Sequence, residues 1–263
     1  MKIEVLNHAS VKITDGLVIY VDPYLVNKPY HDADYIFITH DHYDHYDEES
    51  INKVSKETTK IITPTCLEKT NPYLVVEPNK EYNLDNKIYF ETIPSYNLGK
   101  PYHPKEKNYV GFNILLKGKT YYIMGDTDIT EEAKKVVTDT CFVPIGGTYT
   151  MDYQEAAKYI NMIKPKVCVP IHYGKVAGSI KDADRFKKLV SKDIDVEILI
   201  NPLSDKTLEE LKEESIQKLI ISKKAKDEKL RESAKKEYKL LVKEIAKRKI
   251  IEEENENDKY KRR

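Results

Sequence analysis

Three histidines and two aspartates fall within six residues, 40–45, which read His-Asp-His-Tyr-Asp-His. They follow an apolar run at 35–39 that is typical of a strand. Imidazole and carboxylate groups together suit zinc, manganese or iron, and no cysteine stands close enough to indicate a structural thiolate site. A solvated polar loop is the alternative interpretation, because histidine and aspartate are also common in turns. The density of ligand-type residues favours a metal centre.

Further candidate ligands stand after other predicted strands. His103 lies in the loop after the strand predicted at 88–92, Asp126 follows the run 120–124, and His172 follows the run 167–171. Each residue alone would more often be an ordinary core or surface residue. Because a sheet brings many strand ends to one edge, residues distant in sequence can form one coordination shell there. Their repetition at strand ends predicts that they join residues 40–45 in a single site.

Residues 1–203 alternate short β-branched or aromatic runs with turn signals and a few helical stretches, which is typical of a mixed α/β protein. Strands are predicted at 2–6, 11–14, 17–21, 35–39, 61–63, 88–92, 110–116, 120–124, 141–144, 167–171 and 196–200. These elements predict a layered catalytic domain over residues 1–203.

Two helix starts are predicted where an aspartate is followed three residues later by a glutamate. The pairs are Asp128 with Glu131 and Asp152 with Glu155, and both satisfy the pattern of an N-cap with a capping box. The second helix should end near Lys164, because the proline that follows cannot continue it.

Residues 204–263 form a charged extension that is rich in Lys and Glu and contains no Gly or Pro. Apolar residues in steps of four and three predict a helix there; they are Leu230, Ala234, Tyr238, Leu241 and Ile245. Two interpretations stay open: terminal helices packed on the domain, or a coiled coil or partner-binding arm that would make the protein a homo-oligomer. Residues 252–263 are predicted to fray.

Composition narrows the class of protein. The 44 Lys and Arg residues balance the 44 Asp and Glu residues, so no net field favours nucleic acid or an acidic membrane as partner. Three cysteines far apart in sequence, Cys66, Cys141 and Cys168, predict reduced core thiols rather than disulfides. No apolar stretch approaches the roughly 18 residues of a membrane span, and the N-terminus does not read as an export signal. A cytoplasmic location is expected.

The ligand order, H-x-H-x-D-H after a strand, then a distant His, a G-D-T and a last His, resembles that of the metallo-β-lactamase superfamily. Within it the chain is most similar to the branch of ascorbate-6-phosphate lactonase and N-acylphosphatidylethanolamine-hydrolysing phospholipase D. The supporting motifs are Asn7-His8-Ala9-Ser10, Asp22-Pro23, His103-Pro104-Lys105, Gly125-Asp126-Thr127 and Tyr149-Thr150-Met151-Asp152. The resemblance covers roughly residues 1–201 and implies a four-layer αββα sandwich.

This resemblance also implies two divalent ions, most often zinc, with manganese or iron as alternatives. It assigns His40, His42 and His103 to one ion, assigns Asp44, His45 and His172 to the other, and makes Asp126 a bridge. Two ions about 3.5–4 Å apart bind a shared water, lower its pKa and polarise the bond that it attacks. Asp44 and Asp126 are the expected catalytic residues, and Asp44 would orient the hydroxide and later protonate the leaving group.

Several residues have weaker predicted roles. Asp22 is a candidate hydrogen-bond acceptor for a ligand histidine, although a turn before Pro23 explains it equally well. His8 is a candidate substrate contact, with a polar loop as the alternative. The loop 149–152 is expected to border the pocket. Three lysines near His103 are candidates for binding a phosphate or carboxylate, or form an exposed loop; they are Lys100, Lys105 and Lys107.

The sequence therefore predicts a cytoplasmic metal-dependent hydrolase that cleaves a small lactone, ester, amide or phosphodiester with a metal-bound hydroxide. An RNA-processing nuclease of the same superfamily is disfavoured by the short interval between Asp126 and His172 and by the neutral charge. Flavodiiron redox chemistry is disfavoured because Glu would replace His42 and a flavin domain would follow. A secreted β-lactamase is disfavoured by the missing export signal. A non-catalytic metal-binding regulatory protein stays open as an alternative.

Overall fold

The computed structural model describes residues 1–201, 203 and 206–261. The chain divides into two compact units, Met1–Ile200 and Asn201–Arg263. Their boundary falls at 200/201, beside the predicted division at 203/204. The first unit carries the candidate site and the second is helical.

Two sheets make up the middle of the first unit. The first has the order β1-β2-β3-β4-β5-β6 and the second the order β13-β12-β11-β10-β9-β8-β7. The first sheet contains β1 (Lys2–Asn7), β2 (Ser10–Thr14), β3 (Val18–Val21), β4 (Ala33–Phe37), β5 (Ser55–Pro64) and β6 (Leu74–Val76). The second contains β7 (Glu81–Leu84), β8 (Ile88–Pro94), β9 (Val110–Leu116), β10 (Lys119–Ile123), β11 (Thr140–Pro144), β12 (Val167–Ile171) and β13 (Asp195–Val196).

Strand direction changes within each sheet at a strand that leads to the site. Strands β3 to β6 run parallel in the first sheet, and β10 to β13 run parallel in the second. The remaining neighbours pair antiparallel. Since parallel strands end at the same edge, the residues that follow β3 and β4 lie together, as do those that follow β10 and β12.

Alternation along the central strands shows why two layers of helix are needed. Ile19 and Phe37 face the core between the sheets, whereas Tyr20 and Ile36 on the same strands join a second apolar cluster on the outer face. A sheet that is apolar on both faces must be covered on both. Helix α1 (Glu48–Val54) supplies Ile51 and Val54 to that outer cluster.

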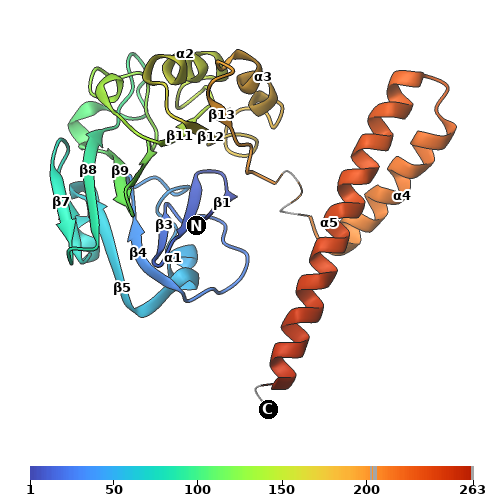
Figure 1. Ribbon diagram of the computed structural model, residues 1–263, viewed down its shortest axis with the longest axis horizontal. Coiled ribbons are helices and arrows are strands. Elements are labelled where there is room, and N and C mark those ends of the chain that lie inside the picture. The colour runs from blue at the N-terminus through green and yellow to red at the C-terminus, as the bar shows by residue number, and fades with distance from the viewer. Residues whose placement is uncertain (202, 204–205, 262–263) are drawn as a thin grey trace. The chain divides into compact units, whose positions relative to one another are not determined.

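Helices α2 (Tyr153–Ile163) and α3 (Asp182–Leu189) lie beside β11 and β12 on the outer face of the second sheet (Figure 1). Ala156 and Ile160 of α2 and Phe186 of α3 are buried in the main core. The layers are therefore helix, sheet, sheet and helix, and the predicted αββα sandwich is confirmed.

Most predicted strands are present, with ends that differ by one or more residues, but the prediction of a helix after Asp128 is wrong. Only a short 3₁₀ turn, η3 (Ala133–Lys135), forms there. The Asp128 carboxylate instead accepts hydrogen bonds from the Leu98 amide at 2.7 Å and the Lys100 ammonium at 2.6 Å. Asp128 therefore does not cap a helix, because its carboxylate oxygens bind the loop that contains Leu98 and Lys100.

Other differences concern short elements. Strands β6 and β7 and helices α1 and α3 were not predicted, because their local sequence signals are weak. The strand predicted at 196–200 is shorter in the structure, where β13 has only two residues. The prediction of α2 is confirmed: Asp152 and Glu155 form a capping box, and Lys164 adopts the left-handed conformation that ends the helix. All three cysteines are free, as predicted, although Cys66 is only partly buried and the core location holds for Cys141 and Cys168.

The second unit is a pair of helices, α4 (Leu208–Lys224) and α5 (Glu228–Lys261), packed on each other. Leu211 of α4 and Ala234 and Leu241 of α5 are buried between them. Residues 252–261 continue α5, so the prediction that they fray is wrong for this stretch, while residues 262–263 lie outside the described residues. Among the described helices, none is long and apolar enough to cross a membrane.

The α2 capping box gives a test of the fold. The Asp152 carboxylate accepts from the Gln154 and Glu155 amides at 2.8 Å each, so Asp152→Ala leaves both donors without this partner. We expect the substitution to lower the free energy of unfolding by about 1 kcal/mol, measured by urea denaturation. Asp152→Asn keeps an acceptor and should stay near wild type. Equal losses for both variants would contradict the capping role.

Candidate metal centre

The first group of site residues comes from a single turn between β4 and α1. The His45 and Tyr46 amides donate to the His42 carbonyl at 3.0 and 2.8 Å, which curls the chain directly after β4. The Asp47 carboxylate then accepts from the Glu49 amide and caps α1. This turn directs His40, Asp44 and His45 toward one point, where all three are buried.

The second sheet contributes the remaining candidate ligands. Asp126 follows β10, His172 follows β12, and His103 lies in the loop after β8; all three are buried. Gly146, just beyond β11, leaves room for this approach, because a Cβ there would lie 2.4 Å from the His172 carbonyl oxygen. The site therefore forms where the ends of strands from both sheets meet.

Asp126 lies at the centre of the cluster, and its two carboxylate oxygens contact different histidines. Oδ1 is 3.2 Å from His45 Nε2, while Oδ2 is 2.9 Å from His172 Nε2 and 3.4 Å from His103 Nε2. His103 Nε2 is also 3.2 Å from His42 Nδ1. The structure thus brings all seven predicted ligands together: His40, His42, Asp44, His45, His103, Asp126 and His172.

Ligand atoms within 4.8 Å of one another form three groups in this cluster. One group contains His40, His42 and His103. The second contains Asp44, His45 and His172 together with His8, and the third contains His40, His45 and Asp126. The first two match the predicted division between two ions, except for the addition of His8.

Asp22 fixes the histidines that follow β4. Its carboxylate accepts hydrogen bonds from the Thr39 amide at 2.8 Å, the Thr39 hydroxyl at 2.6 Å and His45 Nδ1 at 2.7 Å. Because the Thr39 proton goes to Asp22, the Thr39 oxygen accepts from His40 Nδ1 at 2.9 Å. Both rings therefore carry their proton on Nδ1 and direct Nε2 into the cluster, as a metal ligand requires.

A comparable role falls to Asn97, which sequence reasoning missed. Its Oδ1 accepts from the His103 amide at 3.1 Å and from His103 Nδ1 at 3.0 Å, so His103 Nε2 faces Asp126. Its Nδ2 donates to the Tyr149 carbonyl at 2.9 Å. The Tyr109 hydroxyl, also missed, donates to Asp41 at 2.6 Å and holds the turn from the other side. No residue type or spacing distinguishes these two residues in the sequence.

His8, which was predicted to contact substrate, lies deeper in the protein than that role requires. It occupies the turn between β1 and β2, is fully buried, and its Nε2 is 3.2 Å from Asp44 Oδ2. Its ring centroid is 4.0 Å from that of His172. His8, Asp22 and His172 all have positive φ angles, of 45°, 47° and 56°. Such backbone costs of order 1–3 kcal/mol per residue and is typical of functional sites.

The electrostatics of the cluster favour bound cations. Burial lowers the pKa of His45, but the carboxylates of Asp126 and Asp22 outweigh it and hold the pKa well above its usual value. Burial likewise lowers the pKa of His172, and Asp126 and Asp44 raise it to about 9. Burial raises the pKa of Asp126, but His172 and His45 hold it well below its usual value. A field that favours protons on these nitrogens also favours divalent ions.

Two other rings of the cluster are held neutral. Burial, followed by the charge of His45, lowers the pKa of His40 well below its usual value. Burial lowers the pKa of His103 to about 4. Neutral imidazole is the form that ligates a metal.

The donor set fits divalent transition metals. His40 Nε2, His45 Nε2 and Asp126 Oδ1 are buried and have no hydrogen-bond partner among the described residues. Buried polar atoms normally have hydrogen-bond partners, so unpaired ligand atoms that lie within 4.8 Å of one another indicate a cation site among them. Imidazole and carboxylate donors without thiolate suit zinc, manganese or iron.

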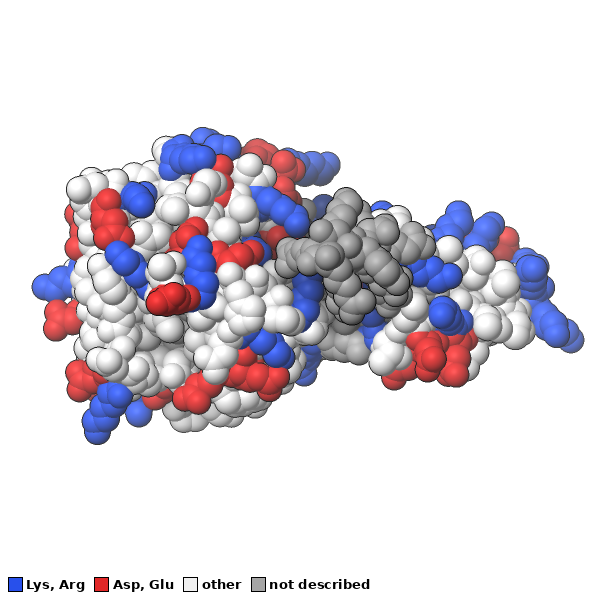
Figure 2. Space-filling view, turned by 90° about the horizontal axis from the view of Figure 1, so that it is seen from below, with Lys and Arg blue, Asp and Glu red and all other residues white. Residues whose placement is uncertain are grey.

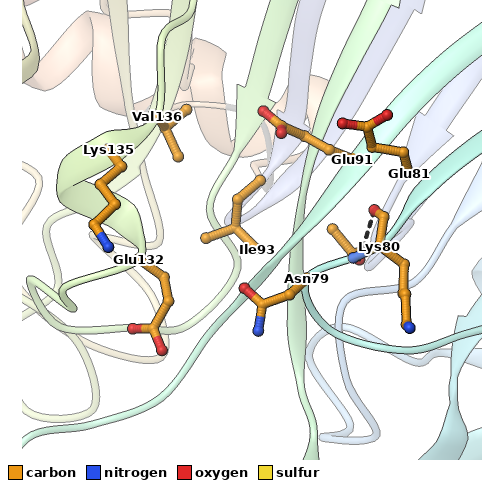
Figure 3. Close-up of a pocket in the computed structure, with 9 residues that line it drawn as sticks. Asn79, Lys80, Glu81, Glu91, Ile93, Glu132, Lys135 and Val136 are labelled. Carbon is orange, nitrogen blue, oxygen red and sulfur yellow. Dashed lines mark hydrogen bonds between the residues drawn. The ribbon is translucent and has the colours of Figure 1, made fainter.

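A surface hollow elsewhere does not belong to this site. It has a volume of about 310 Å³ and lies between the β7–β8 strands and η3, where Glu81, Glu91, Glu132, Lys80 and Lys135 line it (Figure 3). None of the clustered histidines borders it. Its mixed charges give no convergent set of ligand atoms.

Two of the three lysines near His103 are already paired. Lys100 Nζ donates to Asp128 at 2.6 Å and to the Thr150 carbonyl at 2.7 Å. Lys105 Nζ is 2.9 Å from a Glu132 oxygen. The exposed-loop interpretation is therefore better supported for these two than binding of a phosphate or carboxylate.

Comparison with known proteins defines the class. Residues 2–172 match the family described as "Beta-lactamase superfamily domain", a stretch that holds both sheets up to β12 and every candidate ligand. The chain belongs to this superfamily.

Its relatives define the family more narrowly. The chain is 30% identical over 218 residues to a UPF0173 metal-dependent hydrolase of Pyrococcus abyssi, which covers 76% of this chain and 96% of the relative. It is 32% identical to a UPF0173 metal-dependent hydrolase of Staphylococcus aureus, in a match that covers 69% of this chain and 88% of the relative. A crystal structure from Parabacteroides distasonis, described as a metal-dependent hydrolase, superposes with a TM-score of 0.66 at 31% sequence identity. The superposition covers 75% of this chain and 91% of that one. The chain is a member of the UPF0173 metal-dependent hydrolase family.

The Asp22 contacts give a test of the centre. Asp22→Asn removes the charge and one acceptor, so His40 and His45 lose their fixed orientation. We expect zinc affinity, measured by competition with a chromogenic chelator, to fall about 10- to 100-fold. Asp85→Asn, which changes a surface carboxylate paired with Lys60, should bind zinc like wild type. Unchanged affinity in Asp22→Asn would contradict the orienting role.

Proposed function

We propose that this enzyme is a dinuclear hydrolase that cleaves a small lactone, ester, amide or phosphodiester. The carrying observation is that the Asp126 carboxylate contacts histidines of both groups: His103 of the first, and His45 and His172 of the second. One buried carboxylate in contact with both groups is the arrangement expected for a ligand that bridges two ions.

In this proposal His40, His42 and His103 would hold one ion, Asp44, His45 and His172 would hold the second, and Asp126 would be available to both. Zinc is the proposed metal, and manganese and iron are the alternatives. When bound, two such ions supply an activated water and polarise the bond under attack.

Asp44 is the proposed proton carrier. Its Oδ2 lies 3.2 Å from His8 Nε2 and 3.5 Å from His172 Nε2, so the carboxylate is held at the centre of the second group. Burial raises the pKa of Asp44, but hydrogen bonds from His172 and His8 hold it well below its usual value. Asp44 is therefore ionised. In the proposal this carboxylate accepts a proton from the attacking water and later protonates the leaving group.

His8 supports Asp44 in this scheme. Its full burial argues against the predicted direct contact with substrate, and its hydrogen bond fixes which way the Asp44 carboxylate faces. His42 is the one predicted ligand that is partly exposed, so we propose that substrate approaches past His42 and the neighbouring Tyr43.

The nuclease alternative gains no support from the surface. Figure 2 shows basic and acidic side chains interspersed on the face that it presents, whereas a nucleic-acid track needs clustered Lys and Arg. Likeness to the lactonase and phospholipase D branch, location in the cytoplasm, a small-molecule substrate and self-association through the helical pair stay predictions from the sequence.

Metal content tests the dinuclear proposal. Protein purified without chelator should contain about two transition-metal ions per chain by elemental analysis, and the same measurement identifies the metal. His45→Ala should lower this content, whereas His31→Ala should not, because His31 lies on the surface with Nδ1 near the Ser55 carbonyl. Fewer than one ion per wild-type chain would overturn the proposal.

Activity tests the catalytic assignment. Asp126→Ala and His45→Ala should abolish hydrolysis in a screen of lactones, thioesters and bis-p-nitrophenyl phosphate, because each removes a ligand from the centre. His31→Ala again serves as the matched control and should retain activity. An absence of metal-dependent turnover across the screen by wild-type protein would favour the non-catalytic metal-binding alternative.

A further inference from the structure

Four tyrosines surround the metal centre without being part of it. They are Tyr24, Tyr43, Tyr102 and Tyr149, which we call the tyrosine collar. Tyr43 stands between His42 and Asp44 in the sequence, and Tyr102 directly precedes His103. The Tyr24 ring centroid is 6.1 Å from that of His8. Tyr24, Tyr43 and Tyr102 therefore adjoin different parts of the site, and Tyr149 is linked to it through Asn97.

The collar consists of two edge-to-face pairs. Tyr24 and Tyr43 have ring centroids 6.1 Å apart with an interplanar angle of 76°, and Tyr102 and Tyr149 are 4.7 Å apart at 81°. Asn97 ties the second pair to the centre, because it binds both the Tyr149 carbonyl and His103.

One ring of each pair is open to solvent, whereas its partner, Tyr24 or Tyr149, is partly buried. Tyr43 is 66% exposed and Tyr102 is 42% exposed, although the candidate ligands beside them are largely buried. Exposed aromatic groups around a site are typical of ligand recognition, since a ring gains contact area when a partner covers it.

Little positive charge on the His103 loop is available to an anionic substrate, because two of its three lysines are paired and only Lys107 is left. Lys100 and Lys105 on the His103 loop are held by Asp128 and Glu132, so their charge is compensated within the protein. The collar itself offers ring faces and phenol hydroxyls, which suit flat, neutral groups.

We propose that the tyrosine collar selects uncharged carbonyl substrates that carry an aromatic ring or a similar flat apolar group near the bond that is cleaved. This inference rests on the proposed hydrolytic function and names the substrate class of the same site. It makes the collar residues determinants of specificity rather than catalytic residues.

Hydroxamates test the collar apart from turnover, because they bind divalent metals and are not hydrolysed in the assay. Calorimetry with the zinc-loaded full chain compares acetohydroxamate with phenylacetohydroxamate. We expect the phenyl compound to bind wild type about three- to tenfold more tightly. Tyr43→Ala and Tyr149→Ala should remove most of this preference and leave acetohydroxamate binding unchanged.

Two controls separate ring contact from general damage. Tyr43→Phe keeps the ring and should keep the preference. Tyr89→Ala removes a tyrosine that is 49% exposed on β8 and is not part of the collar, so it should also behave like wild type.

Several outcomes would overturn the proposal. Equal affinity of wild type for both hydroxamates would do so, as would a preference that survives in both alanine variants. Tighter binding of a hydroxamate with a carboxylate in place of the ring would show an anionic substrate class instead. If neither hydroxamate binds the zinc-loaded protein, the proposed metal centre itself is wrong, and the collar proposal fails with it.

Discussion

The hydrogen bonds of Asp22 are the constraint on which the candidate centre depends. This buried carboxylate follows β3 and binds the neighbouring strand end through the Thr39 amide and hydroxyl. Through His45 directly and through the Thr39 oxygen to His40, it fixes the orientation of two rings. Without it, the dense turn after β4 would be a flexible set of donors, since each imidazole can rotate and exchange its proton between two nitrogens.

The two-sheet architecture positions the ligands that are distant in sequence, Asp126 and His172, just as Asp22 positions His40 and His45. Parallel strands in each sheet end at a common edge, and the core between the sheets holds these edges against each other. Phe37, on β4, packs edge to face against Phe112 on β9 with ring centroids 5.1 Å apart. Such contacts are rigid, because interiors are close-packed, so Asp126 and His172 meet the β4 turn within hydrogen-bonding range.

The site combines a buried reactive centre with an exposed aromatic border, and these parts have different consequences. Imidazole and carboxylate ligands define metal-dependent hydrolysis, which is the class that the family shares. The collar bears on which substrate reaches them. Fold and ligands alone therefore leave the substrate open, as the same scaffold can carry different borders.

The ligand-type residues of this protein are recognisable in its sequence. Ligand types at strand ends name seven residues that the structure brings together, because strand periodicity and metal preference are local properties, and the order of these residues carries the family resemblance that implies the αββα fold. Tertiary structure alone decided the rest. Asn97 and Tyr109 orient the site through contacts that no spacing encodes, and Asp128 caps no helix because the His103 loop takes its oxygens. His8 and the collar tyrosines likewise gain their meaning from neighbours distant in the chain, since packing, rather than local sequence, brings those neighbours together.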